Sequence, residues 1–401
     1  MVFLELLLAA LLGTLAGVVT GLTPGIHINL VSVLIVTAAP LLGQYFSLVS
    51  LCAFIISMSV THSFLDTIPS VFLGAPDAAT ALGVLPGHRY LLRGWGLMAV
   101  KLSLVGSLVG AVLSVLLFPL FTLLVTLTYP FFKAVIGWLL LAIVLFMILR
   151  DRLKAWSAFV FLLAGALGVL VLNLPGLQNP LFPLLSGLFG VATLFVSLQE
   201  TTSLPPQQES PELNVRPGVT VQALSAGQIA GFLTAMLPGL GPASAAVLSL
   251  QVFRNLGDHG YMILQGSLST VNFVLSLAAL LVLDKARNGS VIAIQQLLAS
   301  VTLAHIMLFL AITLTATGAA TLLTLWFGKV FCRLVSVVNY RALVTGIILF
   351  IVILTPILRS WTGVLILIIS TAVGLIPAIV KVARVHAMGC LLLPVILYFL
   401  G

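Results

Sequence analysis

The sequence has 401 residues, of which 61% are hydrophobic and only 6% are charged. Soluble domains carry about 25% charged residues, so a water-facing surface cannot be built from this composition. An ordinary soluble protein is therefore excluded, and most of the surface is expected to contact membrane lipid. The formal net charge of +8 does not make nucleic acid an expected partner, because the basic residues gather in short clusters at the ends of apolar segments.

These basic clusters are typical of the positive-inside anchoring of membrane segments. A cationic vestibule that attracts anions is also compatible with them. The clusters are Arg89 with Arg93, then Arg150, Arg152 and Lys154, then Lys285 with Arg287, and finally Lys381 with Arg384.

Long stretches without Asp, Glu, Lys or Arg predict the membrane-spanning elements. One runs from Glu5 to Asp66 and another from Lys154 to Glu200. A spanning helix needs about 20 apolar residues, and helices satisfy their own backbone hydrogen bonds in hydrocarbon. We therefore predict an all-α, multi-pass protein of the cell membrane with roughly ten to twelve membrane elements, some of them incomplete crossings. The apolar N-terminus lacks a basic leader and carries Glu5, so it is expected to be a retained membrane segment.

The first apolar stretch is interrupted at Pro24-Gly25. Proline removes a helical hydrogen bond and glycine permits unusual backbone angles, so together they can end one half-helix and start another. Thr23 is a plausible N-cap for a new helix with Pro24 at its first position. The free N–H groups and the positive dipole end of such a helix favour an anion. His27 and Asn29 follow the break, although a buried, hydrogen-bonded histidine explains His27 equally well.

Polar residues also interrupt the next apolar stretch, where His62, Ser63, Asp66 and Thr67 occur. An intramembrane carboxylate is costly and is usually functional. Asp66, with Thr67, is therefore a candidate for binding a coupling cation or exchanging a proton. The alternative is an interfacial carboxylate or a buried partner for a nearby arginine.

A polar, proline-rich segment near the midpoint reads QETTSLPPQQESPELNVRPG. It predicts a linker at 199–218 between a first membrane repeat at 1–198 and a second at 219–401. Two halves of this size are typical of transporters built from internal repeats. The orientation of the repeats, inverted or parallel, is not evident from the sequence.

The second half contains a matching break at Pro238-Gly239, 214 residues after the first. Gly241 and Pro242 can start a new half-helix there, and Ser244 follows. Matching interrupted helices in the two halves of a transporter are a strong sequence indication of its binding site. The stretch at 61–76 pairs with that at 270–285 at an offset of 209 residues, which brings in Asn272. The predicted substrate-binding residues are Thr23, Pro24, Gly25, His27, Asn29, Pro238, Gly239, Gly241, Ser244 and Asn272.

No motif indicates a cofactor, a metal or catalysis. Cys52, Cys332 and Cys390 are far apart, and no CxxC pair occurs, so neither a disulfide framework nor a zinc site is expected. The HExxH, GxSxG and Walker patterns do not occur either. An intramembrane enzyme using His27, His62 and Asp66 is an alternative, as is a purely structural subunit, but we expect neither.

Several of these segments resemble the TctA family, the permease subunit of tripartite tricarboxylate transporters. The family's P-G-x-G-P break is matched at 238–242, and FLDTIPSVFLGAPDAATALGVLPGHRYLLRGWG (64–96) resembles the stretch that follows the family's first break. DKARNGSVIAI (284–294) resembles its counterpart in the second repeat, and VARVHAMGCLLLPVILYF (382–399) is similar to the archaeal-type branch. The first break departs from the pattern, because it reads PGIHIN, and the chain is shorter than a typical bacterial permease.

The resemblance implies two repeats, a site between broken helices and cation-driven uptake of di- or tricarboxylates such as citrate. The alternative is a translocase for a polyprenyl-phosphate carrier lipid, because phosphate also suits paired helix N-termini. The expected partners are membrane lipid, an anionic small molecule or lipid headgroup, a small membrane subunit or solute-binding protein, and further copies of the chain.

Overall fold

The computed structural model describes residues 2–23, 28–74, 84–175, 180–200, 205–209, 217–236, 242–253, 256–286, 288–298, 300–337, 340–359 and 361–400. Within these ranges every regular element is a helix. Eight helices are long and apolar enough to cross a membrane. Shorter apolar helices accompany them: Phe118–Phe131, Gly137–Arg150, Leu181–Val196, Val344–Pro356 and Arg384–Leu400. The predicted all-α, multi-pass membrane class is confirmed.

The first half of the chain begins with a long helix, a break and a second helix. Its helices are α1 (Val2–Leu22), α2 (Ile28–Leu42), α3 (Leu48–Leu65), α4 (Thr67–Phe72), α5 (Val84–Leu92), α6 (Gly96–Leu116), α7 (Phe118–Arg150), α8 (Lys154–Leu172), α9 (Leu181–Leu185), the π-helix η2 (Ser186–Val191) and α10 (Ala192–Glu200). Long uncharged apolar runs form these helices because lipid leaves a backbone no hydrogen-bond partner but itself.

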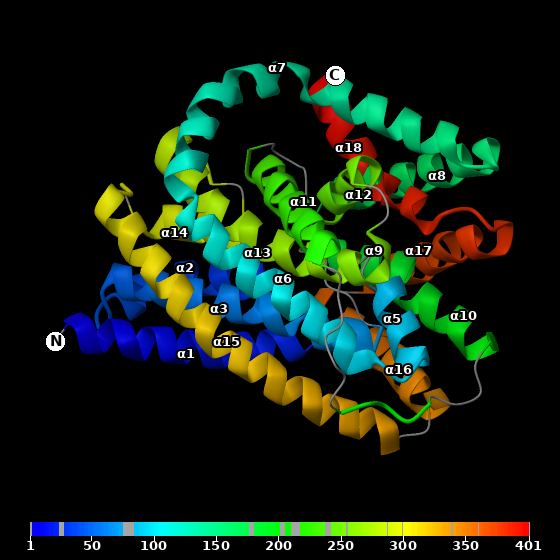
Figure 1. Ribbon diagram of the computed structural model, residues 1–401, viewed down its shortest axis with the longest axis horizontal. Helices are drawn as coiled ribbons and strands as arrows, with labels where there is room; N and C mark the ends of the chain where they lie inside the picture. The colour runs from blue at the N-terminus through cyan, green and yellow to red at the C-terminus, as the bar shows by residue number, and fades with distance from the viewer. Residues whose placement is uncertain are drawn as a thin grey trace.

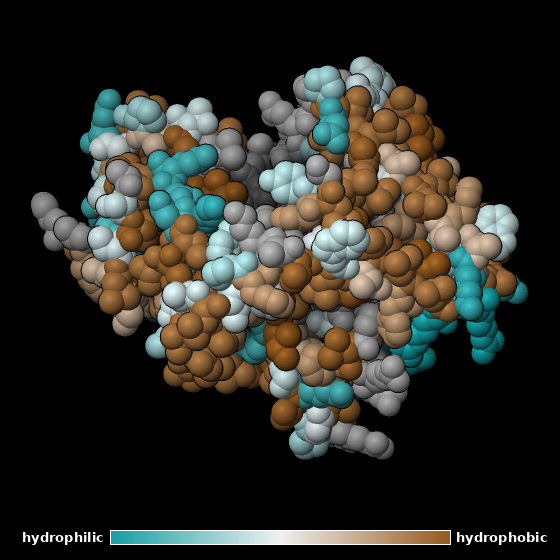
Figure 2. Space-filling model, turned by 90° about the horizontal axis from the view of Figure 1, so that it is seen from above, coloured by the Kyte–Doolittle hydropathy of each residue, from teal (hydrophilic) through white to brown (hydrophobic). Residues whose placement is uncertain are grey.

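The second half follows a similar order of long and short helices. It comprises α11 (Pro217–Met236), α12 (Pro242–Val252), α13 (Gly257–Leu283), α14 (Gly289–Leu297), α15 (Leu303–Val337), α16 (Tyr340–Arg359), α17 (Trp361–Val380), the 3₁₀-helix η3 (Arg384–Met388) and α18 (Gly389–Leu400). Figure 1 shows α15 crossing in front of α3 and running alongside α6, and α7 arching along the opposite edge of the molecule. Most of the surface in Figure 2 is hydrophobic, with polar residues in small groups.

Helices of the two halves interlock in reciprocal pairs. Within each half the first helix packs along the third long one, α1 on α3 and α11 on α13. Between the halves, α6 packs on α13 while α15 packs on α3. In the region near the C-terminus, α8 packs on α18 while α17 packs on η2. These four contacts between the halves therefore form two pairs in which the halves exchange places, whereas the contact of α7 with α13 has no such counterpart among the described residues.

Residues 205–209 of the predicted linker lie between the end of α5 in the first half and α15 in the second, where Arg333 Nε donates to Glu209 Oε2 at 2.8 Å. Gln207 Nε2 donates to Leu91 O at 2.9 Å, and Gly96 N donates to Gln207 Oε1 at 3.1 Å. Gly94 has a φ of +79°, and a Cβ there would lie 2.7 Å from Pro206 O, so glycine permits this close approach. The neighbouring helices extend further than predicted, because α10 ends at Glu200 and α11 begins at Pro217.

Candidate functional site

Described helices end and begin on either side of the first predicted break. Helix α1 ends at Leu22, the Thr23 N–H donates to Val19 O at 3.1 Å, and α2 begins at Ile28. Thr23 therefore continues the hydrogen bonding of α1. Pro24, Gly25 and His27 lie outside the described residues, so the capping role predicted for Thr23 stays a prediction. Asn29 belongs to the first turn of α2, and its side chain also lies outside the description.

The second break has the same arrangement of flanking helices. Helix α11 ends at Met236, and α12 begins at Pro242, the first helical position that suits proline because its missing N–H needs no partner. Pro238, Gly239 and Gly241 lie outside the described residues. Ser244 is in the first turn of α12, and its side chain is outside the description.

Closely packed glycines bring the end of α1 against α3. A Cβ added at Gly17 would lie 2.6 Å from Thr61 Cβ, and one at Gly21 would lie 2.8 Å from Leu65 Cβ. Glycines four residues apart on one helix face allow two membrane helices to approach this closely. The last turn of α1 is therefore held next to the polar segment of α3.

Thr23 at the end of α1 and Asp66 at the end of α3 lie at the same level of the molecule. The two helices start side by side, because Ser47 N donates to Glu5 Oε1 at 2.6 Å. At 1.5 Å per helical residue, Thr23 is about 27 Å beyond Glu5 and Asp66 about 28 Å beyond Ser47. Asp66 is 4% exposed, and it joins α3 to α4 through its backbone, since its N–H donates to His62 O at 2.9 Å.

The second half repeats this packing. A Cβ at Gly227 would lie 2.6 Å from Ser267 Cβ, and one at Gly231 would lie 2.7 Å from Val271 Cβ and 3.2 Å from Asn272 N. Asn272 is 8% exposed. It therefore lies beside α11, just over one turn before the end of that helix at Met236.

These contacts match residues of α3 with residues of α13 at a spacing that differs from the offset of 209 residues found in the sequence. The glycines of α1 and α11 correspond at 210 residues, and their contacts on α3 and α13 correspond at 206, as Leu65 and Val271 show. At this spacing Asp66 corresponds to Asn272, whereas the sequence offset of 209 paired Asn272 with Ser63. Asp66 and Asn272 thus stand one residue beyond matching glycine contacts, Leu65 with Gly21 and Val271 with Gly231.

Neighbours of both positions form hydrogen bonds to the same part of α6. Thr67 Oγ1 lies 3.0 Å from Ser103 Oγ, and Thr270 Oγ1 donates to Ser107 O at 3.1 Å. Ser103 and Ser107 are one helical turn apart on α6. Asp66-Thr67 and Thr270-Asn272 therefore flank one turn of α6. We call Asp66, Thr67, Ser103, Ser107, Thr270 and Asn272 the polar belt.

Ser103 and Ser107 of α6 were not among the predicted site residues. The sequence pattern at this place is two serines four residues apart, each with a glycine three residues after it, Gly106 and Gly110. These glycines pack against Ile263 and Ser267 of α13. Serine in an apolar helix often bonds only to its own backbone, so this pattern alone did not distinguish a belt from ordinary packing. His62, predicted as a weak candidate, bonds through Nδ1 to Thr20 Oγ1 at 3.1 Å.

Comparison with known proteins places the chain in a family. The model of the tripartite tricarboxylate transporter TctA family matches residues 7–389. The chain belongs to the TctA family. It is also 30% identical over 404 residues to an uncharacterized protein of the archaeon Methanocaldococcus jannaschii, covering 98% of this chain and 99% of that protein. No solved structure matches the chain.

TctA-family membership confirms the resemblance found in the sequence. The chain is a multi-pass membrane permease and not an enzyme. Members of this family belong to tripartite transport systems, so partner subunits are a general property of the family.

Proposed function

We propose that the chain is a secondary transporter that moves a small di- or tricarboxylate across the cell membrane, driven by a cation gradient. The observation that carries this proposal is the position of the two helix breaks. Each follows a glycine-packed helix, and each lies close to a buried polar position, Asp66 or Asn272. Interrupted helices at matching places in two halves are typical of transporter binding sites.

The proposed anion site uses the break residues. Helix α12 begins at Pro242, and the unpaired N–H groups of its first turn favour negative charge. On this side Gly239 and Gly241 supply backbone N–H donors and Ser244 a hydroxyl, while Pro238 interrupts the helix and has no N–H to donate. On the other side the donors come from the Thr23 hydroxyl, Gly25, His27 and Asn29, and Pro24 is the interruption. Asn272 adds a side-chain amide.

The proposed cation site lies at Asp66 and Thr67. A carboxylate that is 4% exposed is costly in a membrane protein unless a positive charge or a proton compensates it. The Thr67 hydroxyl, bonded to Ser103, can offer an oxygen beside the carboxylate. Sodium or a proton bound here would let the cation gradient drive the cycle.

The proposed architecture is two repeats, 1–198 and 219–401, joined by the linker at 199–218. The reciprocal helix pairs and the matched glycine contacts support this division. Two corresponding breaks would then face one shared substrate.

Uptake of radiolabelled citrate into proteoliposomes tests this proposal. With an inward sodium or proton gradient, the wild-type chain should accumulate citrate. The Asp66→Asn variant should lose most of the gradient-driven accumulation, because the amide cannot compensate a cation's charge. Asp284→Asn, at the exposed end of α13, is the matched control and should retain uptake.

A second pair of variants tests the anion side. Asn272→Ala should lower citrate uptake about tenfold or more, the loss expected for one buried hydrogen bond to a charged group. Thr313→Ala removes a polar side chain on α15 that is 1% exposed and whose hydroxyl, among the described residues, bonds to Phe309 O of its own helix, so this variant should transport normally. Equal uptake by both variants and the wild type would remove the polar belt from the site.

The same vesicles test the carrier-lipid alternative. Flipping of a polyprenyl-phosphate lipid, with no citrate uptake under any gradient, would replace the carboxylate proposal. Adding a solute-binding protein or a small membrane subunit then tests whether the chain needs the partners that its family uses.

A further inference from the structure

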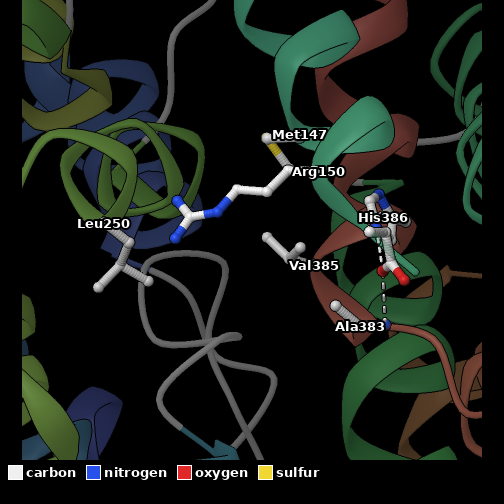
Figure 3. Close-up of a pocket in the computed structure, with 7 residues that line it drawn as sticks. Met147, Arg150, Leu250, Ala383, Val385 and His386 are labelled. Carbon is white, nitrogen blue, oxygen red and sulfur yellow. Dashed lines mark hydrogen bonds and ion pairs between the residues drawn. The ribbon is translucent and has the colours of Figure 1, made fainter. Parts of the chain in front are cut away.

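A pocket of about 220 Å³ lies where α7 ends, away from the polar belt. It is lined by Met147, Arg150, Asp151, Leu250, Ala383, Val385 and His386. Figure 3 shows the Arg150 side chain extending from the last turn of α7 toward Leu250 of α12, with Val385 nearby. The first half supplies the end of α7, and the second half supplies α12 and η3.

Arg150 brings a positive charge to this pocket. Its side chain is exposed and forms no ion pair with another described residue. The adjacent Asp151 is engaged elsewhere, because its Oδ2 lies 3.0 Å from His386 Nε2 and its Oδ1 accepts from Leu153 N at 3.2 Å. The guanidinium therefore remains available to a ligand, and its planar donors match a carboxylate or a phosphate.

His386 contributes a second polar atom. Its side chain is 2% exposed, and its Nδ1 is buried without a hydrogen-bond partner in the described part of the chain. Buried polar atoms are nearly always hydrogen-bonded. Because Nε2 bonds to the Asp151 carboxylate, Nδ1 of the neutral ring is an acceptor, so a water or another donor completes its bonding and the anionic oxygens are left to Arg150. Asp151 holds the ring in place through the other nitrogen.

The rest of the lining is apolar. Met147, Leu250, Ala383 and Val385 surround the polar groups, so the pocket suits a charged oxygen group attached to carbon. It is separate from the proposed substrate site, because Leu250 is eight residues, or about 12 Å, along α12 from its first residue Pro242.

We propose that this pocket is a second anion site, in which Arg150 holds the carboxylate or phosphate group of a small anion or a lipid headgroup. The site joins the two halves, since its arginine and its histidine come from different ones. It does not depend on which solute the helix breaks hold.

Protection of arginine against phenylglyoxal tests this proposal. The protein in phosphatidylcholine nanodiscs is modified with and without citrate or inorganic phosphate, and mass spectrometry measures the rate at each arginine. Either anion should slow modification of Arg150 several-fold. Arg152 is exposed but does not line the pocket, so its rate should not change and it serves as an internal control.

Nanodiscs that contain phosphatidylglycerol, without added anion, distinguish the source of the ligand. Selective protection of Arg150 there identifies a lipid headgroup, and protection by citrate or phosphate alone identifies a soluble anion. The four conditions are no added anion, citrate, phosphate and phosphatidylglycerol. An Arg150 modification rate that stays the same, relative to that of Arg152, in all four would overturn the proposal.

Variants give an independent measurement. Native mass spectrometry should show that Arg150→Gln retains less citrate or phosphatidylglycerol than the wild type, while Arg152→Gln retains as much. Asn272→Ala should keep the protection of Arg150 even if it loses transport, so failure of the substrate site and failure of this pocket are distinguishable.

Discussion

Asp66 and Asn272 occupy equivalent places in the two halves but differ in charge. Both are buried, and both adjoin the same turn of α6 through Thr67 and Thr270. A carboxylate in one half and an amide in the other would give the protein one cation position rather than two. The two positions therefore differ in side-chain charge, although each lies beside a similar glycine contact.

An exchange of these two residues tests their equivalence. The double variant Asp66→Asn/Asn272→Asp keeps one carboxylate in the polar belt. It should regain part of the gradient-driven citrate uptake that Asp66→Asn loses, because the charge returns to a corresponding position. Uptake in proteoliposomes measures this, and a folded double variant as inactive as the single one would contradict the equivalence.

Asp151 makes the protein sensitive to acid. Partial burial raises the pKa of its carboxyl, but hydrogen bonds from His386 and from the Leu153 and Ala383 N–H groups outweigh this and lower the pKa to about 2. Because the folded pKa lies below the unfolded value of about 3.9, this contribution to stability is complete above pH 4 and is lost as the pH falls toward 2.

Thermal unfolding in detergent between pH 5 and pH 2 measures this dependence. The melting temperature of the wild type should fall in the lower half of this range. Asp151→Asn should melt lower at pH 5 and lose part of the pH dependence, because its amide does not titrate. Parallel curves for the two proteins would show that Asp151 does not contribute.

At the scale of helices, glycine spacing determines how α6 meets α13. A Cβ at Gly106 would lie 2.0 Å from Ile263 O and 2.8 Å from its carbonyl carbon. Gly106→Ala should therefore separate the helices and destabilise the protein by about 1–3 kcal/mol or more. Gly318 in α15 has nothing within 4 Å of an added Cβ, so Gly318→Ala should be neutral or stabilising by up to about 1 kcal/mol. Melting curves of the two variants measure the difference.

The helices could be predicted from the sequence, but the way they pack could not. Uncharged apolar runs specify spanning helices because few other structures survive in lipid. The spacing of 206 residues rests on glycine contacts such as Gly21 with Leu65 and Gly231 with Val271. The sequence pairing used an offset of 209, because low identity between the halves gives no sign of these contacts.

The site was predicted only in part for related reasons. Asp66 was identifiable because a carboxylate in an apolar run is unusual. Ser103 and Ser107 were not, because serine is common in membrane helices. Arg150 was interpreted as a membrane anchor, and only the structure shows that Leu250 and His386, distant in sequence, lie around it.

At the scale of the whole molecule, basic residues gather at one end. Contacts between His386 and Asp151, Arg384 and Thr193, and Gln207 and Leu91 join the elements of this end. Its lysines and arginines are Arg89, Arg93, Arg150, Arg152, Lys154, Lys329, Arg333, Arg341, Lys381 and Arg384. The opposite end, where α1 and α3 begin and α13 ends, carries Glu5, Asp284 and Lys285. Because ten basic residues lie at the first end, the positive-inside rule predicts that this end faces the cytoplasm.

Cysteine labelling in whole cells tests this orientation. A membrane-impermeant maleimide should label Tyr45→Cys, which lies at the opposite end and is 75% exposed in the wild type, in intact cells. It should label Lys154→Cys only after permeabilisation. The three native cysteines are buried and give little background. The reverse pattern would invert the assigned topology.

Ser267 of α13 touches glycines from both halves, Gly110 of α6 and Gly227 of α11. This triple contact ties α6 of the first half to α11 and α13 of the second. Figure 2 shows a hollow between two lobes, but the lobes are not the two halves of the chain. If the two lobes move against each other to expose a substrate alternately to each side of the membrane, each moving lobe contains helices of both halves. A chain cut at its midpoint would therefore give two fragments, neither of which contains a whole lobe.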